Sequence, residues 1–438
     1  MLKDAQGQAI SGATAEAAEQ YDQAIRAASL AHGDVMGRLD AAIAAAPDFV
    51  MPRIAKGWFF ALSRDPLMAD RARAMVTAAA ALPVNERERS HLAALDKAAS
   101  GARAAAIGLL DRHLMTWPFD ILAHQVALLF DLSQGRVRWM RERAARALPQ
   151  WSRDQPGHAV LQSFHAFGLE ECGDYARAED ESREVAQREP HSWFAHHTVS
   201  HVMEMMGRAE DGVGWMASRQ AFWATDAHPN RDHIWWHKAL FHLDLGQHDE
   251  AVAIYDGPFL ASEKPLAMSL THAAALLWRL DTLGVDVAQR WAALLPRWDG
   301  HADGRWLAFS DLHAIMAELR SGHEALAEQR LDAMRRTAAG NDEAAETYRA
   351  VGVPVAEALI AFHQGAYARA VERLLPARFE LWRIGGSHAQ RDVFDWTLVE
   401  AAGRGGLRDV AVSLANERLA LKPRSHVNQR FLAMAQAG

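Results

Sequence analysis

The chain has 438 residues, of which 50% are hydrophobic, and its formal net charge at pH 7 is -8. An acidic balance of this kind argues against nucleic acid as a partner, because nucleic-acid-binding proteins gather basic side chains on one face. The one cysteine, Cys172, excludes an intramolecular disulfide and a zinc site built from thiolates.

The opening residues MLKDAQGQAI lack the basic region and the apolar core of a secretory signal. Nowhere does the sequence reach the roughly 18 consecutive apolar residues that a membrane-spanning helix needs. We therefore expect a cytoplasmic protein with no membrane partner.

Apolar residues recur at helical spacing along the whole chain, and glycine and proline fall at regular places between the helical stretches. This pattern predicts an all-α fold. The economical arrangement is a single continuous tetratricopeptide-like α-solenoid over residues 1–438, with about eight to ten helical hairpins curled around a polar concave face.

The N-terminal part, residues 1–150, carries the weakest version of the pattern. The segment AHGDVMGRLDAAIAAAP is a shortened hairpin, and Gly101 and Pro118 have the separation of a turn glycine and the proline that ends the following helix. We expect degenerate hairpins here, because the terminal repeats of a solenoid are atypical.

The most regular repeats fall in residues 151–260. The turn sequence GDYARA begins at Gly173, Pro190 ends the helix that follows, and the next turn glycine is Gly207. The interval between the two glycines is about 34 residues, the period of the tetratricopeptide helix–turn–helix unit. The interval from Gly207 to Gly246 is longer, which predicts an inserted loop of about five residues between these two turns.

Residues 261–438 continue the pattern with turn glycines at Gly322, Gly365 and Gly406. Pro423 follows Gly406 at the same interval at which Pro190 follows Gly173. This spacing predicts C-terminal hairpins that complete the stack.

Histidine and tryptophan crowd the stretch 191–242, inside the regular repeats. In a tetratricopeptide unit the first helix of each pair lines the concave face, at about positions 2, 5, 9, 12 and 13 when the turn glycine is numbered 15. The residues that this register places there are Glu170, Glu171, His197, His201, Glu204, His233 and Trp236. His237 falls just beyond the face, towards a neighbouring helix, but forms an i,i+4 pair with His233 and is therefore also a candidate.

The chemistry of this set points to a ligand or a metal ion. His197, His201 and Glu204 share one helical face, and imidazole and carboxylate groups bind zinc, iron or manganese, so these three are the candidate metal ligands. The same three side chains with Glu170 are candidate catalytic groups, because they can transfer protons. The side chains expected to contact a bound ligand are Glu171, His233, Trp236 and His237.

A second distinctive block is GGSHAQRD, which begins at Gly385. It predicts a tight turn followed by a helix with Ser387 as its N-cap. The exposed N–H groups of a helix start, together with His388 and Arg391, suit a carboxylate or phosphate ligand. The alternative is a capped helix in which Arg391 and Asp392 hold neighbouring repeats together. His272 and His313 are weaker candidates, because a lone histidine in an apolar helix usually belongs to the core.

Several segments of the chain resemble the tetratricopeptide repeat protein 38 family. They include HAFGLEECGDYARAE, HIWWHKALFHLDLG, GGSHAQRDVF and ERLALKPRS, and the resemblance covers about residues 150–430. It implies an all-α tetratricopeptide-like solenoid. It implies no particular activity.

Two classes of function remain open at this point. The concave face could bind a small organic ligand, as an enzyme that uses acid–base or metal-assisted hydrolysis or as a binding protein. It could instead be a groove that holds a protein or peptide, without chemistry. A homo-oligomer interface would also account for aromatic patches.

Overall fold

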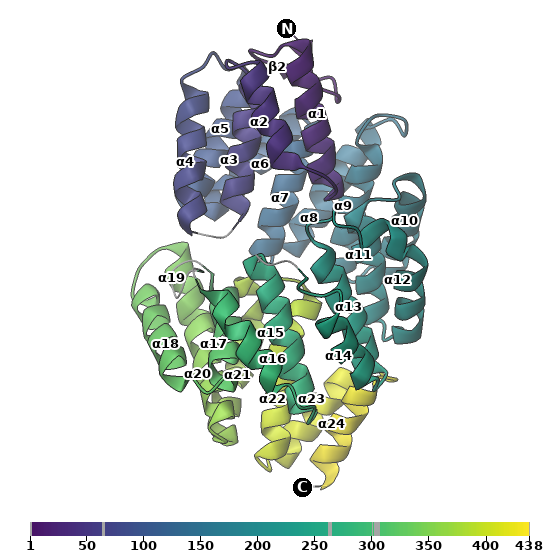
Figure 1. The fold of residues 1–438 in the computed structure, drawn as a ribbon, viewed down its shortest axis with the longest axis vertical. Coiled ribbons are helices and arrows are strands. Elements are labelled where there is room, and N and C mark those ends of the chain that lie inside the picture. Colours follow the sequence, from purple (N-terminus) through teal and green to yellow (C-terminus); the bar gives the residue numbers. More distant parts are fainter. Residues whose placement is uncertain (1, 64–65, 262–264, 300, 302–306, 438) are drawn as a thin grey trace. The chain divides into compact units, whose positions relative to one another are not determined.

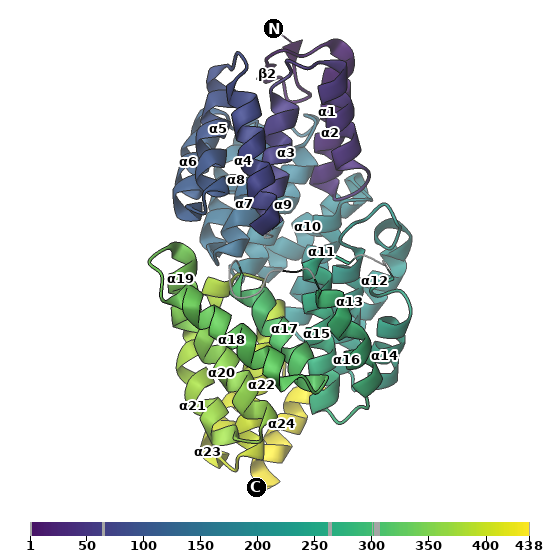
Figure 2. The same cartoon turned by 60° about the vertical axis from the view of Figure 1, so that its left-hand side comes forward.

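Helices joined by short turns make up nearly all of the described chain (Figure 1). The structure is a computed structural model, and it describes residues 2–63, 66–261, 265–299, 301 and 307–437. Consecutive helices pack side by side, as α3 (Met51–Leu62) with α4 (Pro66–Ala80) and α20 (Val353–His363) with α21 (Tyr367–Ala377) (Figures 1 and 2). Among the residues that the structure describes, no helix has both the length and the apolar character that crossing a membrane requires. The all-α fold is confirmed, and the contacts between neighbouring helices are consistent with a helical repeat.

The chain divides into two compact units. The first comprises Met1–Val199 and Ala221–Asn230, and the second comprises Ser200–Gln220 and Arg231–Gly438. The chain changes unit three times: inside α11 (Trp193–Met205), inside α12 (Ala209–Trp223) and at the start of the helix that begins at Arg231. One continuous solenoid over the whole chain stays a prediction.

The first unit begins with a two-stranded antiparallel hairpin and continues with helices. Before α11 its elements are β1 Leu2–Lys3, β2 Ala9–Ile10, α1 Ala15–Leu30, α2 Val35–Ala45, α3, α4, α5 Glu86–Ala99, α6 Arg103–Thr116, α7 Ile121–Ser133, α8 Val137–Ala147, the short η1 Leu148–Gln150, α9 His158–Glu171 and α10 Tyr175–Arg188.

The second unit comprises the end of α11, most of α12 and the residues from 231 onwards. Its further elements are α13 Arg231–Asp244, α14 His248–Asp256, α15 Ala267–Thr282, α16 Ala288–Leu294, η2 Leu295–Trp298, α17 Ala308–Arg320, α18 Glu324–Ala338, α19 Glu343–Thr347, the π-helical turn η3 Tyr348–Gly352, α20, α21, η4 Arg378–Ile384, α22 His388–Arg404, α23 Arg408–Leu421 and α24 His426–Ala437.

Glycine in the left-handed conformation separates the two helices of nine pairs in the described chain, with φ between 64° and 87°. These glycines are Gly101, Gly135, Gly173, Gly207, Gly246, Gly284, Gly322, Gly365 and Gly406. Without a Cβ atom, glycine adopts this conformation at little cost, and it commonly ends a helix. Every turn glycine predicted from the spacing is confirmed, and Gly135 and Gly284 add two more.

In the first unit, small side chains let helices approach closely. Gly168 of α9 faces the backbone of α8, and a Cβ atom at this position would lie 2.5 Å from the backbone nitrogen of Arg141. Only glycine is compatible with this contact.

The first unit also contains helices that are capped by side chains. Asp120 accepts a hydrogen bond from the N–H of Ala123 at the start of α7.

In the second unit, helix α22 is surrounded by other helices. It packs against α15, α20, α21, α23 and α24. Two tryptophans fix the α15–α22 contact: Trp278 donates to Thr397 Oγ1 and Trp396 donates to Thr282 Oγ1, each at 2.9 Å. Ser387 caps α22 as predicted, in a capping box with Gln390. The interior of this unit is thus filled by one of its own helices.

Candidate functional site

In the second unit, α13 presents two imidazoles to each other. The Nε2 atoms of His233 and His237 lie 3.1 Å apart. On its other side, the Nδ1 atom of His237 lies 2.8 Å from Oε2 of Glu204, on α11. His201, one turn before Glu204, packs its ring edge-on to that of His237 at 4.5 Å between centroids. These four side chains are buried.

The chain of contacts continues from α13 to α15 and α22. His233 Nδ1 lies 2.9 Å from Nε2 of His272, and Nε2 of Gln390 lies 2.8 Å from the same His272 atom. The other end of the Gln390 amide accepts the Ser387 N–H at 2.8 Å. Trp236 covers the imidazoles, with its ring centroid 4.9 Å from those of His237 and His272.

Electrostatics keep the carboxyl group of Glu204 ionised. Burial by itself raises the pKa of Glu204, but the charge of Lys422 and the hydrogen bond from His237 bring that pKa down to about 2. Lys422 Nζ lies 3.7 Å from Glu204 Oε1 and 3.5 Å from Asp244 Oδ2. Burial, reinforced by the neighbouring His201, lowers the pKa of His237 to about 4. At neutral pH the pair is therefore a carboxylate and a neutral imidazole.

The hydrogen bonds fix which nitrogens carry protons. Because the Ser387 N–H can only donate, the Gln390 atom that it meets is the oxygen, and the amide NH₂ group points at His272. His272 Nε2 is therefore an acceptor. In the Nδ1–H tautomer, His233 shares this acceptor with the Gln390 amide, and a neutral His233 then carries a lone pair on Nε2.

The same reasoning applies to His237. An ionised carboxylate only accepts, so His237 donates through Nδ1 to Glu204, and the neutral ring carries its lone pair on Nε2. Two lone pairs at 3.1 Å repel each other unless a cation lies between them. His201 belongs to the same group, in which one ring nitrogen of each imidazole lies within 4.8 Å of those of the others. The geometry suits a metal ion, because ligand imidazoles characteristically donate their second N–H to a carboxylate or another acceptor.

A second group of titratable side chains, in the first unit, differs from this site because its imidazole nitrogens are already hydrogen-bonded. His91, His113 and Asp120 also lie within 4.8 Å of one another. There, Trp58 donates its indole N–H to His91 Nδ1 at 3.1 Å, and His91 Nε2 lies 2.9 Å from Asp120 Oδ2. Because indole only donates and the carboxylate only accepts, both nitrogens of His91 are engaged. This group is a closed hydrogen-bond network and offers no lone pair of His91 to a metal ion.

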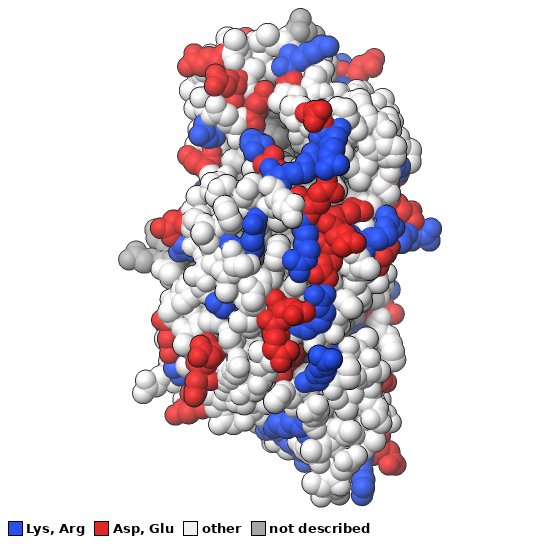
Figure 3. Space-filling view, turned by 90° about the vertical axis from the view of Figure 1, so that its right-hand side faces the viewer, with Lys and Arg blue, Asp and Glu red and all other residues white. Residues whose placement is uncertain are grey.

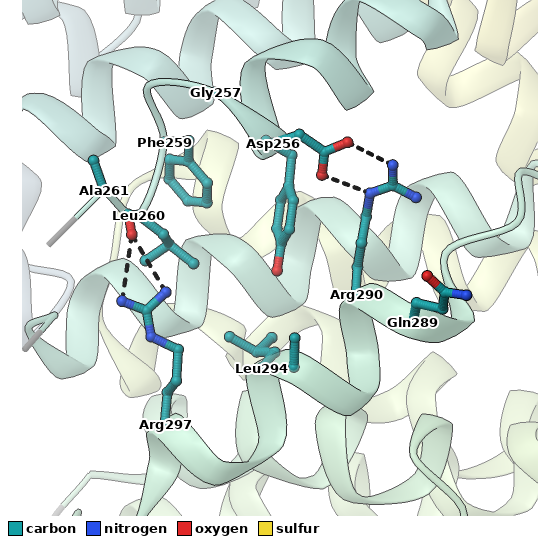
Figure 4. Close-up of a pocket in the computed structure, with 11 residues that line it drawn as sticks. Asp256, Gly257, Phe259, Leu260, Ala261, Gln289, Arg290, Leu294 and Arg297 are labelled. Carbon is teal, nitrogen blue, oxygen red and sulfur yellow. Dashed lines mark hydrogen bonds and ion pairs between the residues drawn. The ribbon is translucent and has the colours of Figure 1, made fainter. Parts of the chain in front are cut away.

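A surface cavity of about 520 Å³ lies elsewhere in the second unit, between α14, α16 and η2 (Figure 4). Arg290 binds Asp256 through two hydrogen bonds, at 2.8 and 2.6 Å, on one wall. Arg297 holds the carbonyl oxygen of Leu260 on the other wall, as Figure 4 shows. The cavity is lined by none of the predicted site residues.

The surface charges follow no single sign. Figure 3 shows acidic and basic side chains interspersed over the face that it presents, without a broad basic patch among the coloured atoms. This face lacks the electrostatic character of a nucleic-acid-binding surface.

No family model matches the chain.

The structure brings together five of the predicted site residues within the second unit. Four of them are His201, Glu204, His233 and His237, and the fifth, Trp236, lies beside them. Three others belong to the first unit: Glu170 and Glu171 are the last residues of α9, and His197 stacks on Trp193 with ring centroids 4.2 Å apart. Their predicted convergence with the other four stays a prediction.

The predicted ligand site at the start of α22 has a different character. His388 is the first residue of the helix, and Arg391 donates to the carbonyl oxygen of Gly386. Asp392 lies between Arg279 and Arg418, which are donors from α15 and α23. The contacts of Asp392 match the alternative in which this block ties neighbouring helices together, whereas the hydrogen bond of Arg391 to Gly386 stays within the block.

Two members of the network were missed from the sequence. Gln390 lies in the GGSHAQRD block, and its position three residues after Ser387 identifies it as a capping-box residue. Lys422 belongs to the C-terminal end of the chain, far from Glu204 in the sequence, and no local pattern links the two. His272, a weaker candidate in the sequence, has a central place in the chain of contacts.

Proposed function

We propose that the second unit binds one divalent transition-metal ion through Nε2 of His233, Nε2 of His237 and a ring nitrogen of His201. The observation that carries this proposal is the 3.1 Å approach of two Nε2 atoms whose Nδ1 atoms each lie within hydrogen-bond distance of a different partner. Neutral imidazoles are the preferred ligands of zinc-class ions, so we favour Zn²⁺ over Mn²⁺ and iron.

In this proposal Glu204 and His272 orient the ligands instead of binding the metal. Glu204 accepts the N–H of His237, and His272 accepts that of His233. Such partners fix the tautomer and raise the basicity of a ligand imidazole. Lys422 keeps Glu204 ionised, and Trp236 supplies an apolar wall.

The chemistry that fits three neutral ligands is hydrolysis or a related addition to a small polar substrate. A zinc-class ion with three imidazole ligands keeps one coordination position for water and lowers the pKa of that water to about 7. The filled interior of the second unit supports a confined site over a groove for an extended peptide, because α22 packs against α15 there.

We also propose that the helix pairs are tetratricopeptide-like units. The regular separation of Gly173 and Gly207, both at positive φ, supports this assignment. The resemblance to the tetratricopeptide repeat protein 38 family agrees with it.

The test is a metal titration of protein that carries no His tag and has been stripped with a chelator. We expect His233→Gln and His237→Gln each to lower the bound-zinc stoichiometry by one. The control is His313→Gln, because His313 is a buried imidazole of the same unit whose Nδ1 atom bonds the carbonyl oxygen of Phe309 in its own helix. Unchanged zinc binding in the double variant His233→Gln, His237→Gln would refute the proposal.

Activity is measured separately, with p-nitrophenyl acetate as a probe of metal-dependent hydrolysis. Turnover that is restored by Zn²⁺ and lost in His237→Gln supports the hydrolytic function. Tight zinc binding without turnover on this and related small esters confines the site to a binding or structural role.

A further inference from the structure

Three imidazoles from three separate connections meet within the first unit. His32 follows α1, His191 follows α10, and His228 lies in the inserted loop between α12 and α13. The rings of His32 and His191 stack with centroids 4.3 Å apart, and that of His228 lies 4.8 Å from His32. One nitrogen of each ring lies within 4.8 Å of the other two. Segments far apart in the sequence thus converge on one point.

Contacts outside the imidazoles hold these connections together. The N–H of Gly33 donates to the carbonyl oxygen of Ala227 at 2.9 Å. Arg26 binds Glu189 through two hydrogen bonds, at 3.2 and 2.7 Å. These bonds fix the backbone around the cluster and keep the three side chains close to one another.

Hydrogen bonding and burial favour neutral imidazoles in this cluster. His191 Nδ1 lies 3.3 Å from the carbonyl oxygen of Phe222, which can only accept, so a neutral His191 carries its lone pair on Nε2. His228 is almost completely buried, and burial together with the nearby His32 lowers its pKa to about 4. Burial also lowers the pKa of His32. Neutral imidazole is the form that binds metal ions.

We propose that His32, His191 and His228 form a second, solvent-accessible site for Zn²⁺ or the chemically similar Ni²⁺ and Cu²⁺. Imidazole is the common ligand of these ions, and water completes the coordination. Two stacked rings do not point at one ion, so His32 turns about its side-chain torsions on binding. His32 lies in a connection between helices and is only partly buried, so its ring can rotate.

This site differs from that of the second unit in two respects. The cluster donates to backbone carbonyls and has no carboxylate partner comparable to Glu204 among the described contacts of its three rings. It also requires one ring to move. We therefore expect it to bind zinc more weakly than the site at His233 and His237.

The experiment uses the full chain without a His tag, stripped with a chelator, and titrated with ZnCl₂ by calorimetry. In the His233→Gln, His237→Gln background, we expect one remaining ion, whose affinity falls at least about tenfold in His32→Gln and in His191→Gln. The control is His165→Gln, since His165 of the same unit bonds Glu181 at 2.7 Å outside the cluster.

A second measurement covers the case in which the double background fails to fold. In the otherwise unaltered chain, the double variant His32→Gln, His191→Gln should bind one Zn²⁺ fewer and should lose part of the Co²⁺ ligand-field absorption. Unchanged zinc stoichiometry in that variant overturns the proposal, and so does the absence of bound zinc in the His233→Gln, His237→Gln background at 100-fold molar excess. The proposal for the second unit is unaffected by either result.

Discussion

The Nε2 atoms of His233 and His237 face each other at 3.1 Å, while their Nδ1 atoms face partners on two different helices. One turn of α13 separates the two residues, so the helix itself sets their spacing. The direction in which each ring points is decided by Glu204 on one side and His272 on the other. The following predictions probe that division of roles.

Gln390→Glu should weaken zinc binding about 10- to 100-fold at pH 8. A carboxylate at this position still accepts the Ser387 N–H, but it no longer donates to His272. It attracts the His272 proton to Nε2 instead, which makes His233 Nδ1 an acceptor and moves the His233 proton to the metal-facing Nε2. Competition titration with a chromophoric chelator measures the change.

The matched variant is Gln390→Met, which removes the amide without introducing an acceptor at His272. We expect it to lose less affinity than Gln390→Glu. Added negative charge alone would strengthen cation binding, so tighter binding by Gln390→Glu would contradict the tautomer assignment.

Glu204→Gln should raise the Kd for zinc about 10- to 100-fold, although Glu204 is not a ligand in the proposed site. The substitution removes the charge that supports His237 and keeps the size of the side chain. Asp244→Asn is the control, because Asp244 shares the partner Lys422 but accepts a hydrogen bond from Ser425 where Glu204 accepts one from His237. Equal effects of the two substitutions would show that Glu204 acts only through the local charge.

Gly168→Ala should destabilise the first unit by about 2–4 kcal/mol, since the added Cβ would lie 2.5 Å from a backbone nitrogen of α8. Gly108 of α6 gives the matched control, because a Cβ atom there meets nothing within 4 Å. Gly108→Ala should stabilise by about 0.5–1 kcal/mol, because alanine is the better helix former. Urea unfolding followed by circular dichroism compares the two, and similar midpoints would contradict the close α8–α9 contact.

His313 should make the second unit sensitive to acid. Burial, partly opposed by its hydrogen bond to the Phe309 carbonyl and reinforced by Arg279, lowers the pKa of His313 from 6.5 to about 4. The folded chain thus binds this proton less readily than the unfolded chain. The free energy of unfolding is therefore at its full value with respect to His313 above pH 6.5. It decreases by up to about 3 kcal/mol as the pH falls towards 4.

His313→Phe should remove this part of the acid loss, and an aromatic ring suits a position between Phe309 and Phe394. The measurement is urea unfolding at several pH values between 4 and 7.5. The same slope in the variant and the original chain would show that His313 is not among the titrating groups.

Local patterns in the sequence predicted the helices, the turns and one helix start. The regular spacing of Gly173 and Gly207 predicted two turns, and both glycines have positive φ. The serine of the GGSHAQRD block predicted the N-cap of α22, and Ser387 forms it. These features depend on interactions within about four residues, which a sequence displays directly.

The helical register also predicted that His201, Glu204 and His233 belong to one site, and the second unit brings them together. Only the tertiary structure decided that Glu204 bonds His237 and that Gln390 bonds His272, 118 residues away. It alone decided that α22 fills the interior of the second unit. A helical period shows which residues share a face, but the side chains that meet that face come from helices whose packing depends on the whole core.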